Sequence, residues 1–136
     1  MAVAIIGVLA GIAIPLYAGY QKQARNGTAA SDIGGIAMKL NGYIGDHGIG
    51  PTTLAEIHCD NYLDPWGHPY KYFNIKTATG KGMMRKDRFM VPINTYFDLY
   101  SMGPDGQSQT ALTTQVSKDD IIYAHDGAYI GPAYAL

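Results

Sequence analysis

The sequence contains a single cysteine, Cys59, so the chain cannot form an internal disulfide bond. It is also nearly neutral, with 10 basic and 11 acidic residues and a formal net charge of −1. Nucleic-acid-binding proteins generally carry a strongly basic face, so this balance argues against a nucleic-acid partner. The sequence has no glycine-rich phosphate-binding motif and no recognisable combination of nucleophile, base and orienting group. We therefore do not expect an enzyme.

Charge is absent above all from the first fifteen residues, which carry no charged side chain. A helix over residues 1–14 is about 21 Å long, whereas a membrane span needs ~20 residues. A signal peptide is not favoured, because no basic segment precedes the apolar run and the helical pattern continues beyond it. Such a segment needs a non-aqueous neighbour, either a membrane or other copies of the same helix.

The helical pattern continues through residue 46 but changes character. Apolar residues then recur at spacings of three, four, seven and eleven, which is the pattern of a helix with one buried face: Ile33, Ile36, Ala37, Leu40 and Ile44. Glycine and proline residues that follow Asp46 end the pattern. We predict one long helix over residues 1–46, in which residues 1–21 form the membrane or filament-core part, and a globular body over residues 47–136.

The body alternates turn signals with short segments typical of strands. Thr53 and Glu56 have the spacing of a capping box, which predicts a short helix over residues 52–57. The strand candidates are residues 70–75, 88–93 and 96–102. We therefore predict an α+β fold in which the long N-terminal helix packs on a small antiparallel sheet of about three strands.

A loop rich in Gly, Ser and Thr follows the last strand candidate and carries three carboxylates, Asp105, Asp119 and Asp120. Calcium takes about six to eight oxygen ligands and commonly mixes carboxylates with backbone carbonyls, both of which such a loop supplies. The alternative is a solvated acidic loop, because an Asp-Gly pair is first of all a turn signal. The residues alone leave both interpretations open.

A second group of metal-binding residue types, His58, Cys59 and His68, raises the question of a zinc site. Their spacing is not that of a zinc motif, and adjacent side chains point apart on regular structure. A free thiol at Cys59 is the favoured interpretation.

The apolar segment over residues 4–17, AIIGVLAGIAIPLY, resembles the hydrophobic helix of type IV pilins and pseudopilins. Four segments of the body, which we call the landmark segments, are similar in sequence and order to features of type II secretion major pseudopilins. They are YIGDHGIGPTT at residues 43–53, DPWGHPYKY at 64–72, YSMGPDG at 100–106 and DDI at 119–121. The apolar helix indicates the superfamily, and the landmark segments favour this member of it.

The resemblance implies a structural filament subunit, most similar to a major pseudopilin of a pseudopilus that drives protein export. The alternatives are the major subunit of an extracellular type IV pilus for adhesion, motility or DNA uptake, and a membrane-anchored binding domain. The implied partners are other copies of the chain through the N-terminal helix, the inner membrane before assembly, minor pilins or pseudopilins and the assembly platform. The implied location is the bacterial inner membrane and a periplasmic or extracellular filament.

The resemblance also implies two chemical features. Family members begin with a processed segment that contains a glutamate and a methylated first residue, and we expect this segment to be missing before Met1. The acidic loop of the family carries a structural calcium ion. By resemblance, Asp105 and Asp120 are among its ligands, and Asp119 and the carbonyls of Met102 and Gln107 are additional candidates.

Overall fold

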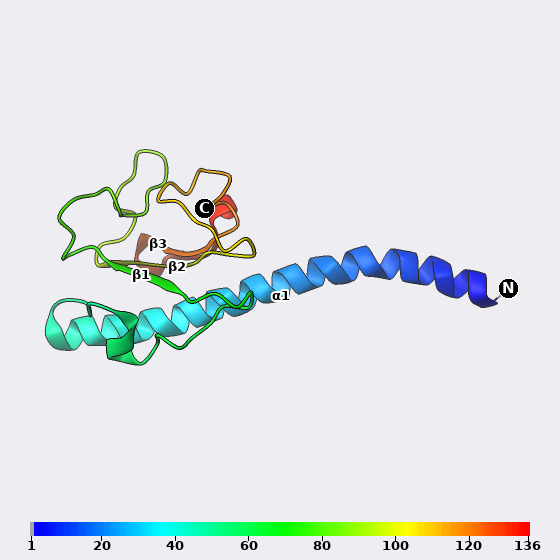
Figure 1. Cartoon of the computed structure of the whole chain (residues 1–136), viewed down its shortest axis with the longest axis horizontal. Helices are drawn as coiled ribbons and strands as arrows, with labels where there is room; N and C mark the ends of the chain where they lie inside the picture. Colours follow the sequence, from blue (N-terminus) through cyan, green and yellow to red (C-terminus); the bar gives the residue numbers. More distant parts are fainter. Residues whose placement is uncertain (1) are drawn as a thin grey trace.

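The computed structural model of the chain combines one long helix with a four-stranded antiparallel sheet, which confirms the predicted α+β, pilin-like fold class (Figure 1). The structure describes the backbone of residues 2–136 and the side chains of residues 16–136. Helix α1 extends over Ala2–His47. Much of the predicted membrane or filament-core part, residues 1–21, lies outside the described side chains. Among the residues that are described, none belongs to a helix with both the length and the apolar character needed to cross a membrane.

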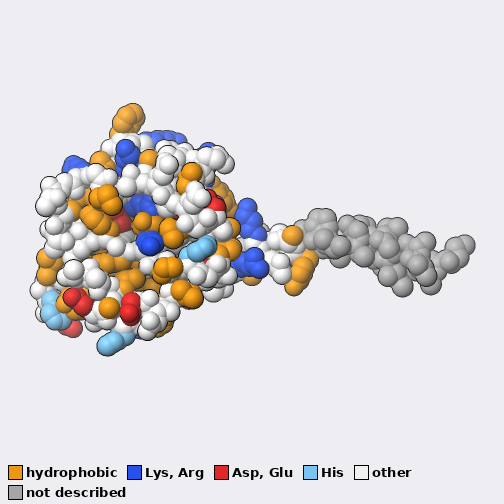
Figure 2. All heavy atoms as spheres, viewed as in Figure 1, with side chains coloured by type: hydrophobic (Ala, Val, Ile, Leu, Met, Phe, Trp, Pro, Cys, Tyr) orange, Lys and Arg blue, Asp and Glu red, His pale blue; other side chains and the backbone are white. Residues whose placement is uncertain are grey.

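One face of α1 packs on the sheet, in the cyan part of the helix in Figure 1. The residues buried on this face follow the predicted spacing: Ala29, Ile33, Ile36, Ala37 and Leu40. They share a core cluster with Phe97, Leu99, Ile121 and Tyr123 from the sheet. Earlier along α1, the large apolar side chains of Leu16, Tyr17 and Tyr20 are more than half exposed. Figure 2 shows apolar and basic side chains on this part of the helix, where it leaves the body.

The sheet is a simple meander in the order β1-β2-β3-β4, with every neighbouring pair antiparallel. Its strands are β1 (Lys71–Asn74), β2 (Phe97–Ser101), β3 (Ile121–Ala124) and β4 (Tyr129–Pro132). All of β3 is buried, because α1 covers one face while Ile93, Leu112 and Ala133 pack on the other.

The predicted set of strands needs two corrections. Residues 88–93 do not form a strand, because Asp87 and Met90 exchange two backbone hydrogen bonds of 3.1 and 2.8 Å and close a tight turn with Arg88 at φ 54°. The segment after the acidic loop forms β3 and β4 instead, which gives the sheet four strands.

The predicted short helix is present as a 3-10 turn, η1 (Leu54–Ile57), but without the predicted capping box. The Thr53 side chain makes no capping hydrogen bond. Glu56 instead accepts a hydrogen bond of 3.0 Å from the backbone N–H of Thr52.

Candidate metal site in the acidic loop

Hydrogen bonds join the landmark segments to one another. Asp64 is buried, and one of its carboxylate oxygens accepts a hydrogen bond of 2.8 Å from the N–H of His68. Its other oxygen accepts a hydrogen bond of 2.6 Å from Ser101 Oγ, at the end of β2. Ser101 Oγ in turn accepts a hydrogen bond of 3.1 Å from the N–H of Gly103. The turn after residue 64 therefore positions the start of the acidic loop.

Asp105, Asp119 and Asp120 converge within the acidic loop, which connects β2 to β3. Each contributes one carboxylate oxygen, and the three oxygens lie within 4.8 Å of one another. The antiparallel pairing of β2 with β3 explains the convergence, because Ser101 at the end of β2 pairs with Ile121 at the start of β3. Residues just after β2 and just before β3 therefore meet at the same edge of the sheet.

The loop needs glycine at two positions where its backbone closely approaches a neighbouring group. Gly103 has φ +69°, and a Cβ atom at this position would lie 2.5 Å from the carbonyl oxygen of Asp119. Gly106 has φ +65°, and a Cβ there would lie 2.8 Å from Nε2 of His68. Both positions combine a left-handed backbone with a close contact, so only glycine fits without strain.

Two of the carboxylates, those of Asp119 and Asp120, lie in an environment that disfavours their charge. Burial raises the pKa of Asp120 to about 7, although Ser108 and Arg85 act in the opposite direction. Burial, followed by the charge of Asp105, also raises the pKa of Asp119. Asp119 Oδ1 and Asp120 Oδ1 are buried and have no hydrogen-bond partner within the described part of the chain. Such acceptors are costly when they are left without a donor or a cation.

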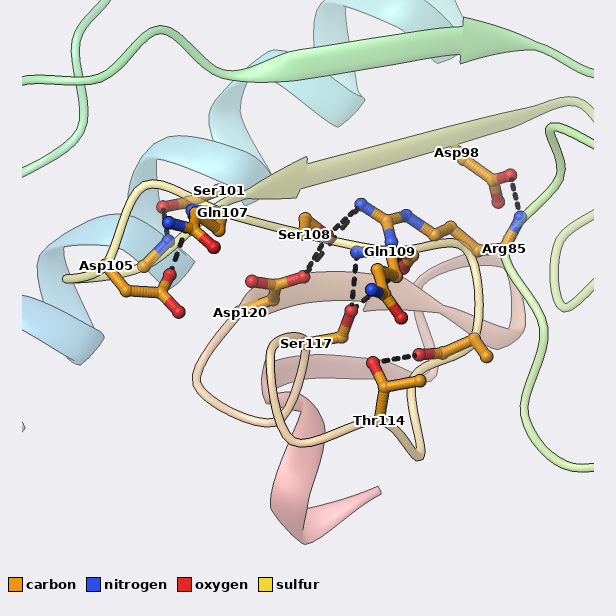
Figure 3. Close-up of polar contacts among 12 residues, drawn as sticks. Arg85, Asp98, Ser101, Asp105, Gln107, Ser108, Gln109, Thr114, Ser117 and Asp120 are labelled. Atoms are coloured by element: carbon orange, nitrogen blue, oxygen red, sulfur yellow. Dashed lines mark hydrogen bonds and ion pairs between the residues drawn. The ribbon is translucent and has the colours of Figure 1, made fainter.

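The two carbonyl candidates lie on the same loop. Met102 directly follows β2 and is half-buried, and Gln107 is exposed. The backbone N–H of Gln107 donates a hydrogen bond of 2.9 Å to Asp105 Oδ1, which holds that carboxylate against the loop (Figure 3). The structure brings the three carboxylates together, and the roles of Met102 and Gln107 as ligands stay predictions.

A buried cation that was not predicted from the sequence, Arg85, lies beside the carboxylates. Its guanidinium donates hydrogen bonds to Ser108 Oγ and to the carbonyl oxygen of Gln109, and its Nη2 lies 3.9 Å from Asp120 Oδ2 (Figure 3). Ser108 Oγ also donates a hydrogen bond to Asp120 Oδ2. In the sequence, Arg85 is one of several basic residues between β1 and β2, and nothing there distinguishes it from its exposed neighbours.

No protein-family model and no solved structure matches the chain. A curated protein does, the type II secretion system core protein G of Pseudomonas aeruginosa. It is 31% identical over 126 aligned positions, which cover 77% of this chain and 78% of that protein. The chain therefore belongs to the family of the type II secretion system core protein G, which is the major pseudopilin. It is a major pseudopilin and therefore a structural subunit, which confirms the function predicted from the landmark segments.

In the described part of the pseudopilin, the histidines and the cysteine are not brought together as a metal-ligating group. Among the described residues, Asp105, Asp119 and Asp120 converge in a group that could hold a metal ion, and His58, Cys59 and His68 form no such group. Cys59 is a buried free thiol whose pKa is raised mainly by burial.

Substitution of Gly103 by alanine should destabilise the pseudopilin by about 3 kcal/mol, because it adds a steric clash to the cost of a left-handed backbone. Gly48→Ala is the matched control, since Gly48 has φ +76° but open space around it. This control should cost about 1 kcal/mol. Urea unfolding of both variants measures the difference, and equal losses would show that the close approach of Gly103 to Asp119 is not tight.

Proposed function

We propose that this pseudopilin polymerises through α1 into a periplasmic pseudopilus and that growth of this filament drives protein export. The observation that carries the proposal is the unequal covering of α1. One face of its second half is buried on the sheet, whereas Leu16, Tyr17 and Tyr20 are exposed and follow fifteen residues without charge. A helix of this kind needs a second apolar surface, which other copies of the same helix provide.

The physical basis is the transfer of the helix from one apolar environment to another. Before assembly, residues 1–21 lie in the inner membrane, and after assembly they pack among neighbouring helices at the centre of the filament. Burial of apolar surface among the neighbouring helices contributes about 25 cal/mol for each Å². This energy allows the helix to leave the lipid, because its apolar surface is not exposed to water in the filament. Head-to-tail contacts that do not close into a ring produce a helical filament. The assembly platform and minor pseudopilins are the further partners that we propose.

A charge in the apolar segment tests this function. Leu9→Glu should abolish filaments while the melting temperature of the body stays unchanged, because the described core cluster between the helix and the sheet begins at Ala29. The control is Asn61→Glu, which adds the same charge to an exposed position of the body. Filaments are counted by electron microscopy in cells that produce the secretion apparatus. Normal filaments from Leu9→Glu would contradict a filament core built from this helix and would mean that the filament assembles through other contacts.

We also propose that a calcium ion binds in the acidic loop, held by Asp105, Asp119 and Asp120. Support comes from the two buried carboxylate oxygens that lack donors and from the convergence of three ligand oxygens. When bound, the ion would neutralise charge that burial disfavours and would connect the two sides of a loop with few apolar residues. The donor set is oxygen only, which suits a hard divalent cation such as calcium.

A further inference from the structure

We infer that Arg85 is a built-in counter-cation of the acidic loop and that it sets the charge of the metal ion that the loop accepts. With the guanidinium in place, the three carboxylates are matched by one divalent ion. This inference rests on the proposed calcium site and adds to it a residue that selects the ion by charge. Arg85 acts here as a positioning and specificity residue and does not itself bind the metal.

Burial and hydrogen bonds fix the guanidinium beside Asp120. Arg85 is only 4% exposed. Ser108 and Gln109 both accept hydrogen bonds from it, and Asp120 Oδ2 lies 3.9 Å from Nη2. Asp120 therefore has two different oxygens: Oδ2 faces Arg85 and Ser108, whereas Oδ1 is buried without a partner.

Two contacts from the sheet hold Arg85 in this orientation. Its guanidinium carbon lies 3.4 Å from the ring centre of Tyr100, a cation–π contact with β2. Its backbone N–H donates a hydrogen bond of 2.8 Å to the buried Asp98. Asp98 thus engages the backbone of Arg85, while the guanidinium points the other way, toward Ser108 and Asp120 (Figure 3). The positive charge cannot move away from the loop without breaking several contacts.

Counted over Arg85 and the three carboxylates of the loop alone, the charges balance when one divalent ion is added. Three ionised carboxylates exceed the single charge of Arg85 by two, so one divalent ion completes the balance. A trivalent ion leaves an excess positive charge beside a buried guanidinium, which is unfavourable. Removal of the Arg85 charge should therefore improve the binding of any cation, and should improve it more for a trivalent ion than for a divalent one.

The test compares Ca²⁺ with Tb³⁺, which has a similar radius and one more charge. Both affinities are measured on the full chain in detergent, by terbium luminescence and by calcium competition. Even with the screening of bulk water, one unit of charge within several ångströms changes affinity about threefold for each charge on the ion. Arg85→Gln should therefore raise the ratio of Tb³⁺ to Ca²⁺ affinity by about threefold or more. The ratio is informative because a loosened loop weakens both ions alike.

Two controls separate charge from packing. Arg85→Lys retains the charge and should keep the wild-type ratio. Lys86→Gln removes the same charge from the next, exposed position and should also keep it. Arg85→Met, whose apolar stem still covers Tyr100, is a second neutral variant for the case in which Arg85→Gln does not fold.

The possible failures are distinguishable. A wild-type chain that binds neither ion would overturn the calcium proposal and this inference together. A wild-type chain that binds calcium while the folded neutral variants keep its ion ratio would overturn only the role of Arg85.

Discussion

Chelation of calcium should lower the melting temperature of the pseudopilin by about 10–20 °C. A ligand present at a hundred times its dissociation constant stabilises the folded state by about 2.7 kcal/mol. In a domain the size of this body, each kcal/mol changes the melting temperature by about 4–8 °C. The loss is expected because the acidic loop keeps two buried carboxylate oxygens without donors when no cation is bound. Scanning calorimetry of the full chain in detergent, in excess calcium and in excess chelator, measures the effect.

Asp120→Asn provides the specific variant for this prediction, because it keeps the shape of the side chain and removes its charge. Its melting temperature should respond only weakly to calcium. Asp60→Asn, at an exposed position outside the loop, should respond as the wild type does. A wild-type melting temperature that is the same in calcium and in chelator would overturn the proposed ion and leave a solvated acidic loop.

Truncation of Leu40 should reduce the free energy of unfolding by about 3 kcal/mol. Leu40 is fully buried in the cluster that joins α1 to β2 and β3, and large-to-small substitutions in such cores cost about 2–5 kcal/mol. The loss combines the transfer energy of the removed methyl groups with the cavity that they leave. Urea unfolding of the Leu40→Ala variant gives the value directly.

The matched control lies two residues earlier on the same helix. Met38 is 76% exposed, so Met38→Ala should change the stability by no more than about 0.5 kcal/mol. Similar losses from both variants would mean that α1 does not present the face that the structure assigns to the sheet.

The long helix could be predicted because its sequence repeats one physical requirement many times. Ile33, Ile36 and Leu40 recur at helical spacing, and each is buried on the same face. The short strands carry a weaker signal in the sequence. Residues 121–124 are apolar at every position, since both faces of β3 are covered, and the alternation that marks a half-buried strand is missing.

The incorrect prediction of a strand over residues 88–93 has a different cause, because here a signal is present and the strand is not. Its apolar side chains resemble those of a buried strand, but Phe89 is fully exposed and Met90 is about half exposed at the turn. Composition alone does not reveal that Phe89 is left uncovered, because that depends on where the rest of the chain lies.

The acidic loop was predictable in part. Asp105 stands next to glycine, and Asp119 and Asp120 are adjacent, so the carboxylates were visible as a group in the sequence. Arg85 was not, because its relation to Asp120 arises from packing between segments far apart in the chain. Tyr100 and Asp98 hold it in place, and neither carries a sequence signal for that role.

The most direct test of the central claim is to look for the filament itself. Cells that produce this pseudopilin together with its secretion apparatus are lysed gently, and the released material is imaged by electron microscopy with gold-labelled antibodies against the body. We expect thin filaments that carry the label along their whole length, as a major subunit requires. Label confined to membranes or to single released molecules, with the apparatus present and no labelled filament, would contradict the account.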